Sequence, residues 1–112
     1  MVDSTLVSDE SNSAIDTIEV FYTAVTASAG GSGCRVVAFT CVNNGSASAT
    51  YKAYIYSSSD SAANTVIPQK IVVKDRFDLG PSIIGHIIPP GGSLRMESSS
   101  TDLSFRVTGR EL

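Results

Sequence analysis

Short runs of alternating apolar and polar residues, separated by turn-forming residues, constrain this chain more than any other feature. About seven such runs occur, and glycine, proline, asparagine or serine breaks the chain between them. Successive side chains of a strand point to opposite faces, so each run predicts a strand with one face toward a core. The expected strands are 16–25, 34–42, 49–56, 66–74, 83–88, 93–97 and 103–108. This pattern is typical of an antiparallel β-sandwich, jelly-roll or immunoglobulin-like, over residues 15–112.

The alternation also predicts which side chains face the core. We expect the inward positions to be Ile18, Val20, Tyr22, Tyr51, Ala53, Ile55, Leu103, Phe105 and Val107. Lys52, Tyr54 and Tyr56 are expected to face outward, as is Phe21, which makes Phe21 a candidate contact residue. The run from Cys34 to Val42 is apolar on both faces and therefore predicts a central strand that is buried on both sides.

The segment IIPPGGS, residues 87–93, predicts a corner and not a ligand-binding loop. Pro89 and Pro90 have no backbone N–H, so the strand before them must stop. Pro90 and Gly91 fit the central positions of a type II turn, whose second residue needs a positive φ. Such a turn does not match the twist of a tight hairpin, so we expect it to pass the chain between two sheets. A phosphate-binding loop would lead into a helix, whereas residues 93–97 alternate as a strand does.

The first 14 residues are polar and serine-rich, and they predict a flexible arm before the sandwich domain. Ordering a residue costs about 1–2 kcal/mol of conformational entropy, which an arm with few apolar residues cannot offset alone. On a partner, Leu6, Val7 and Ile15 are candidate contact residues. The arm lacks the basic start and apolar stretch of a secretory signal, and no segment has the ~20 apolar residues of a membrane span. We therefore expect synthesis in the cytoplasm and no membrane partner.

The composition argues against nucleic-acid, metal and cofactor binding. The net charge is −3, the pI is near 4.9 and no Lys/Arg cluster is present. Cys34 and Cys41 are expected on one strand, about 23 Å apart at ~3.3 Å per residue, too far for a disulfide with each other. With His86 as the one histidine, they cannot complete a four-ligand zinc site. Asp75 and Asp78 lack the spacing of a calcium loop.

No catalytic residues are predicted, and the chain is not expected to be an enzyme. His86 could act as a base, but no nucleophile-elbow motif accompanies it. The one outward cluster of interest is Tyr54 and Tyr56, which could form a flat aromatic strip for a sugar or a protein neighbour. The alternative is that another sheet or a loop covers both faces of their strand.

Three segments carry a resemblance to a known family. They are RVVAFTCVNNGSASATYKAYIY at residues 35–56, IIPPGGSLRMES at 87–98 and TDLSFRVTGREL at 101–112. Together they resemble the small all-β virion structural proteins of tailed bacteriophages. The resemblance implies a capsid decoration, or cement, protein that binds and stabilises the assembled head shell; a head–tail or tail component is the alternative within that family.

The same resemblance implies what the chain binds and where it resides. The expected partners are other copies of the chain, in a homo-oligomer such as a trimer, and the major capsid protein or other virion proteins. The expected location is the virion, after synthesis in the host cytoplasm, and no cofactor is expected. Outside that family, Tyr54 and Tyr56 leave open a non-catalytic carbohydrate-binding β-sandwich module.

Overall fold

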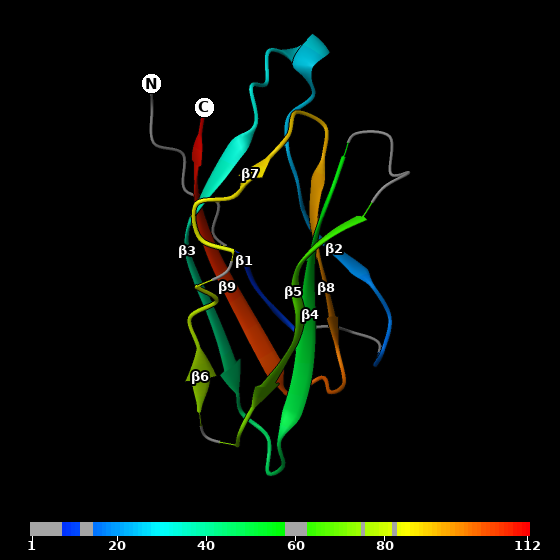
Figure 1. The fold of residues 1–112 in the computed structure, drawn as a ribbon, viewed down its shortest axis with the longest axis vertical. Coiled ribbons are helices and arrows are strands. Elements are labelled where there is room, and N and C mark those ends of the chain that lie inside the picture. Colours follow the sequence, from blue (N-terminus) through cyan, green and yellow to red (C-terminus); the bar gives the residue numbers. More distant parts are fainter. Residues whose placement is uncertain (1–7, 12–14, 58–62, 75, 82) are drawn as a thin grey trace.

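Two antiparallel sheets packed face to face make up the protein (Figure 1). The computed structural model describes residues 8–11, 15–57, 63–74, 76–81 and 83–112, and for 8–11 and 63–69 it describes the backbone alone. Sheet A contains β1 (Ser8–Ser11), β9 (Leu103–Glu111), β3 (Cys34–Asn43) and, on its far edge, β6 (Phe77–Asp78) and β7 (Ile87–Ile88). Sheet B contains β2 (Glu19–Thr23), β8 (Ser93–Ser98), β4 (Ala49–Tyr56) and β5 (Ala63–Val72).

The predicted all-β sandwich is confirmed, and its strand order is that of a jelly roll. β1 pairs with β9, β2 with β8, β3 with β6 and β7, and β4 with β5, always antiparallel. Because β6 and β7 occupy successive parts of the same edge of β3, they act as one interrupted strand. The chain is thus a long hairpin rolled into two layers, which is the jelly-roll and not the immunoglobulin-like arrangement. Within the described residues the only helix is the three-residue 3₁₀ turn η1 (Ala27–Ala29), and none is long enough to cross a membrane.

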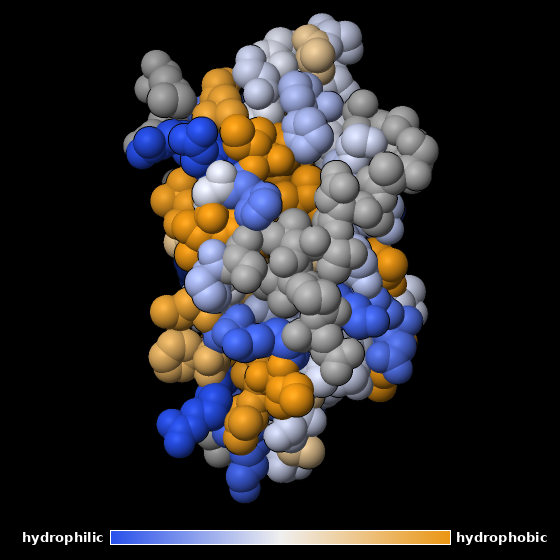
Figure 2. All heavy atoms as spheres, viewed as in Figure 1, coloured by the Kyte–Doolittle hydropathy of each residue, from blue (hydrophilic) through white to orange (hydrophobic). Residues whose placement is uncertain are grey.

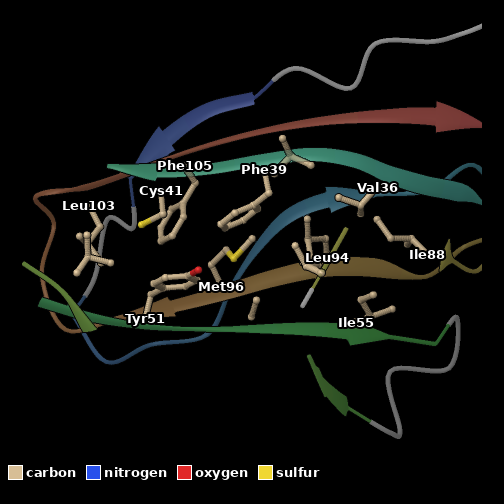
Figure 3. Close-up of a cluster of buried hydrophobic side chains, with 14 of the residues drawn as sticks. Val36, Phe39, Cys41, Tyr51, Ile55, Ile88, Leu94, Met96, Leu103 and Phe105 are labelled. Atoms are coloured by element: carbon tan, nitrogen blue, oxygen red, sulfur yellow. The ribbon is translucent and has the colours of Figure 1, made fainter. Parts of the chain in front are cut away.

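The core fills the space between the two sheets (Figure 3). The predicted inward residues of β4 (Tyr51, Ala53, Ile55) and β9 (Leu103, Phe105, Val107) are all buried. The centre of the core is aromatic: the Tyr51 ring centroid lies 5.9 Å from that of Phe39 and 5.5 Å from that of Phe105. Period-two alternation therefore predicted both inner faces correctly for these two strands.

The expected facing is wrong for Ile18, Val20 and Phe21, whereas Tyr22 packs against the core as predicted. A β-bulge shifts the register between Val20 and Tyr22, so that the adjacent Phe21 and Tyr22 both pack against the core. The Phe21 ring lies edge-on to Phe105, with centroids 6.0 Å apart. Val20 is instead 52% exposed, and Ile18 is also exposed. Phe21, predicted to point outward as a contact residue, is partly buried against the core.

Two other strand predictions differ from the structure. Residues 83–85 form a turn in which Gly85 has a φ of 91°, and only β7 of the predicted strand 83–88 pairs with β3. β3 itself is not buried on both faces, since Val37 is 45% exposed on the outer face of sheet A. No further layer of described residues covers that face, so its apolar side chains meet solvent.

Part of the predicted N-terminal arm belongs to sheet A. The backbone of Ser8–Ser11 pairs antiparallel with residues 104–107 of β9 and forms an edge strand of the sandwich. Leu6 and Val7 lie outside the described residues, as do 12–14. The flexibility of the remainder of the arm stays a prediction.

The proline–glycine corner lies where the sequence predicted it. Gly92 N–H donates to Pro89 O at 2.8 Å and Gly91 has a φ of 74°, as a type II turn requires. The corner leads from β7 in sheet A to β8 in sheet B, so the predicted passage between sheets is confirmed. A side chain at Gly92 would place its Cβ 2.5 Å from Tyr56 O, which explains the glycine there.

Candidate functional site

The histidine and the two cysteines, all among the described residues, lie in different environments. His86 is exposed in the turn before β7, and its carbonyl accepts a hydrogen bond from Val36 N–H at 2.9 Å. Cys34 and Cys41 both lie on β3, which confirms their predicted placement on one strand. Both are buried and both are free. Burial raises the pKa of Cys41 to about 12, so this thiol stays protonated and unreactive at neutral pH. Among the described side chains, no three His, Cys, Asp or Glu residues lie close enough to hold a metal ion.

A buried tyrosine–carboxylate pair joins the two sheets. The Tyr51 hydroxyl on β4 donates to Asp78 Oδ2 on β6 at 2.5 Å, and Gly80 N–H donates to the same oxygen at 3.1 Å. Lys70 Nζ lies 3.7 Å from Asp78 Oδ1. Burial, followed by the hydrogen bond to Asp78, raises the pKa of Tyr51 above its usual 10.0. Asp78, one of the two weighed as calcium ligands, thus has partners within the protein and a structural role.

The outer face of sheet B presents Tyr54, Tyr56, Arg95 and Glu97, which we call the tyrosine face. Both tyrosines face outward as predicted, and both are half-buried. The Tyr54 hydroxyl donates to Glu97 Oε1 at 2.8 Å, and burial together with this bond raises the pKa of Tyr54 to about 12. The Arg95 guanidinium lies 4.1 Å from the centre of the Tyr56 ring.

The tyrosine face does not form a flat aromatic strip. The rings of Tyr54 and Tyr56 are 6.4 Å apart and meet at 62°, edge to face. Arg95 covers one face of the Tyr56 ring. A sugar stacks on an open, flat ring surface, so this arrangement offers less stacking area than the sequence suggested.

Exposed apolar side chains gather on the segment that runs from β6 to β7. Its members, which we call the apolar flank, are Phe77 (64% exposed), Leu79 (54%), Ile84 (43%) and Ile87 (45%). Figure 2 shows hydrophobic surface along the side of the molecule on which β6 and β7 lie, in patches separated by hydrophilic residues. The exposure of Ile84 and Ile87 was not predicted, because residues 83–88 were expected to form a strand. Gly80 and Gly85, both with positive φ, were the signal that the segment turns.

The predicted contact residues lie in different parts of the fold. Tyr54 and Tyr56 are neighbours on one face, whereas Phe21 packs toward the core on β2. Ile15 is 57% exposed and precedes β2. The structure therefore brings together only the two tyrosines of that set, and Leu6 and Val7 lie outside the described residues.

No protein-family model, no curated protein and no solved structure matches the chain. The resemblance to phage virion proteins therefore stays an expectation.

Proposed function

We propose that the chain is a non-catalytic structural protein of a tailed-phage virion, most simply a capsid decoration protein that binds and stabilises the head shell. The observation that carries this proposal is the apolar flank. Apolar patches bordered by polar residues, as on this side of the molecule, mark sites of contact with other proteins. A protein held in an assembly by this side would bury Phe77, Leu79, Ile84 and Ile87 against a neighbour.

The fold is compatible with the proposal but does not decide it. Jelly rolls occur in viral capsid proteins and also in lectins, and function lies in the surface and not in the fold. The edge-to-face tyrosines and the covering Arg95 count against the carbohydrate-binding alternative. A head–tail or tail component of the same virion would use the apolar flank in the same way, and the position in the particle distinguishes it.

The test is co-sedimentation of the purified chain with phage heads assembled without it. Saturable binding to heads, with increased resistance of the heads to heat, supports a decoration protein. Binding to isolated tails and not to heads would move the chain to the head–tail or tail role. Failure to bind either particle, together with binding to a glycan array that is lost in Tyr56→Ala, would overturn the structural role.

Two serine substitutions make the test specific to the apolar flank. Phe77→Ser should weaken binding at least about tenfold, because buried aromatic anchors dominate interface energies. Val20→Ser is the matched control, since Val20 is similarly exposed but lies on β2 in the other sheet. Both variants should keep the melting temperature of the wild type. Equal binding by wild type and Phe77→Ser would show that the apolar flank is not the contact.

A further inference from the structure

One asparagine of this chain stands in a sequence context that favours deamidation. Of the four asparagines, only Asn44 is followed by a glycine, Gly45. In this reaction the backbone nitrogen of the following residue attacks the side-chain amide carbon of the asparagine. A glycine at that position has no Cβ to hinder the attack and leaves the backbone free to adopt the conformation that the attack needs. Asn44 is exposed in the turn that joins β3 to β4, so water reaches it.

The reaction has two steps, and water is the only co-reactant. In the first step Gly45 N loses its proton and forms a bond to Asn44 Cγ, while the Cγ–Nδ2 bond breaks. Ammonia leaves with that proton, and a succinimide ring remains in the backbone. In the second step water adds to one of the two ring carbonyls and opens the ring. Opening at one carbonyl leaves an aspartate at residue 44, and opening at the other leaves an isoaspartate, whose backbone is one carbon longer.

The turn requires the glycine that makes this asparagine vulnerable. A Cβ on Gly45 would lie 2.9 Å from both Cβ and Cγ of Asp102, in the turn before β9, and closer still to its Oδ2. A side chain at residue 45 would therefore displace Asp102. Asn44 N–H donates to the main-chain carbonyl of the same aspartate at 3.0 Å, which holds the two turns together. The Asn44–Gly45 pair is thus part of the packing between these turns.

The folded turn holds both reacting groups in hydrogen bonds. Gly45 N–H donates to Asn43 Oδ1 at 2.9 Å, so a deprotonated Gly45 nitrogen would face the lone pairs of that oxygen. Asn43 is itself fixed, because it is buried and its Nδ2 donates to two main-chain carbonyls at 2.9 and 2.8 Å. Asn44 Nδ2 donates to Ser104 Oγ on β9 at 3.1 Å, which holds the leaving group against the neighbouring strand. The attacking atom and the leaving group are both engaged elsewhere.

We propose that Asn44 is a deamidation site, which the folded β3–β4 turn keeps unmodified and which reacts when that turn opens. The inference is independent of the proposed function. Both hydrogen bonds must break before the ring closes, so folding should slow the reaction at least about tenfold, the factor to which two net hydrogen bonds correspond. The product should also disturb the turn. A new carboxylate at residue 44 would lie in the turn against which the Asp102 carboxylate packs, and like charges repel.

The test measures deamidation by peptide mass spectrometry, in folded and in guanidinium-unfolded protein at the same mildly alkaline pH. In the unfolded chain Asn44 should react before Asn64, which precedes a threonine. In the folded wild type Asn44 should react at least about tenfold more slowly than in the unfolded chain. Equal rates at Asn44 in the two states would overturn the inference, as would a faster reaction at Asn64 than at Asn44 in the unfolded chain.

Two serine substitutions test the contribution of the hydrogen bonds. Ser104→Ala removes the acceptor of Asn44 Nδ2 and should speed the reaction about threefold to tenfold in the folded chain, with no change in the unfolded chain. Ser28→Ala is the matched control, because it removes a hydroxyl that bonds to Thr26 in the loop after β2. Circular dichroism checks that both variants are folded. Equal rates in the wild type and Ser104→Ala, or an equal increase in Ser28→Ala, would overturn the inference.

Hydrogen exchange in the wild type tests the same turn without a substitution. The Gly45 amide should exchange more slowly in the folded than in the unfolded chain, because it donates to Asn43 Oδ1. Equal exchange in the two states would show that the attacking nitrogen is not held, and the inference would be wrong.

Discussion

The two faces of β4 carry the same chemical pair in two environments. Tyr51 points inward and Tyr54 outward, and each phenol donates to a carboxylate, Asp78 and Glu97 respectively. Tyr51 is 1% exposed and its partner lies in the other sheet, whereas Tyr54 is half-buried and its partner lies on the neighbouring strand β8. The inner pair therefore holds two layers together, while the outer pair orders the surface of one sheet. Environment and topology, and not the chemical groups, decide what such a pair contributes.

The largest effect that we expect is a loss of stability at alkaline pH, caused by the buried groups of the core. Burial raises the pKa of Cys41 from 9.0 to about 12, and burial with the hydrogen bond to Asp78 raises that of Tyr51 above 10.0. Above about pH 9 the unfolded chain therefore binds fewer protons than the folded chain, and the free energy of unfolding falls as pH rises toward 12. A pKa shift changes the free energy of unfolding by about 1.4 kcal/mol per unit, so Cys41 alone should lower it by several kcal/mol.

Urea unfolding at a series of pH values from neutral to alkaline measures this loss. Below about pH 9 both groups are protonated in the folded and the unfolded chain. They should therefore cause no change in the free energy of unfolding with pH in that range. Cys41→Ala and Tyr51→Phe should each flatten the alkaline decline more than Tyr54→Phe, because solvent reaches Tyr54. A free energy of unfolding that stays constant to pH 11 would contradict the buried, protonated state of these groups.

Tyr51→Phe should be the more damaging of two matched substitutions at neutral pH. It removes the hydroxyl that donates to Asp78 and leaves a carboxylate with 14% exposure short of one donor. We expect a loss of about 1–3 kcal/mol in the free energy of unfolding, the usual result of leaving a buried polar group unsatisfied. Chemical denaturation gives the value, and a loss no larger than that of Tyr54→Phe would remove the distinction between the two faces.

Tyr54→Phe should have the smallest effect. It removes one partly exposed hydrogen bond to Glu97, and water can replace the lost donor, so we expect a loss of about 0.5–1 kcal/mol. Attachment to heads should not change, because the apolar flank runs between β6 and β7 of the other sheet. A Tyr54→Phe variant with normal stability but weakened attachment would show that the tyrosine face, and not sheet A, makes the contact.

The inward and outward positions of β4 could be predicted from the sequence, but the partners of its side chains could not. Alternation of Tyr51, Ala53 and Ile55 with polar neighbours decides the facing, because a strand has a period of two. The partners Asp78 and Glu97 are 27 and 43 residues away, and no local pattern marks them. The Pro90–Gly91 corner was predictable for a local reason, since proline fixes φ at residue 90 and glycine tolerates the positive φ that the turn needs at residue 91.

The failures have local causes of a different kind. The bulge in β2 adds one residue to a strand and reverses the facing of Val20, which no alternation pattern can reveal. β1 has the sequence SDES, which has no apolar residue to mark a strand, and its pairing with β9 depends on an edge formed at the other end of the chain. The pairing of Arg35 with Arg110 likewise appears only when β3 and β9 are placed side by side, because the two residues are distant in sequence.

The rolled-hairpin order also implies an order of assembly. The β4–β5 pairing closes a loop only between Tyr56 and Ala63, whereas β1–β9 must bring Ser11 to Ser104. The entropy cost of closing a loop grows with its length, by about 0.6 kcal/mol per doubling. Each strand pair that forms shortens the loop that the next pair must close, so pairing should proceed from the innermost hairpin outward. The outermost strand then joins last and is released first. Among the strands of sheet A, β1 should therefore lose its amide protection earliest in hydrogen exchange.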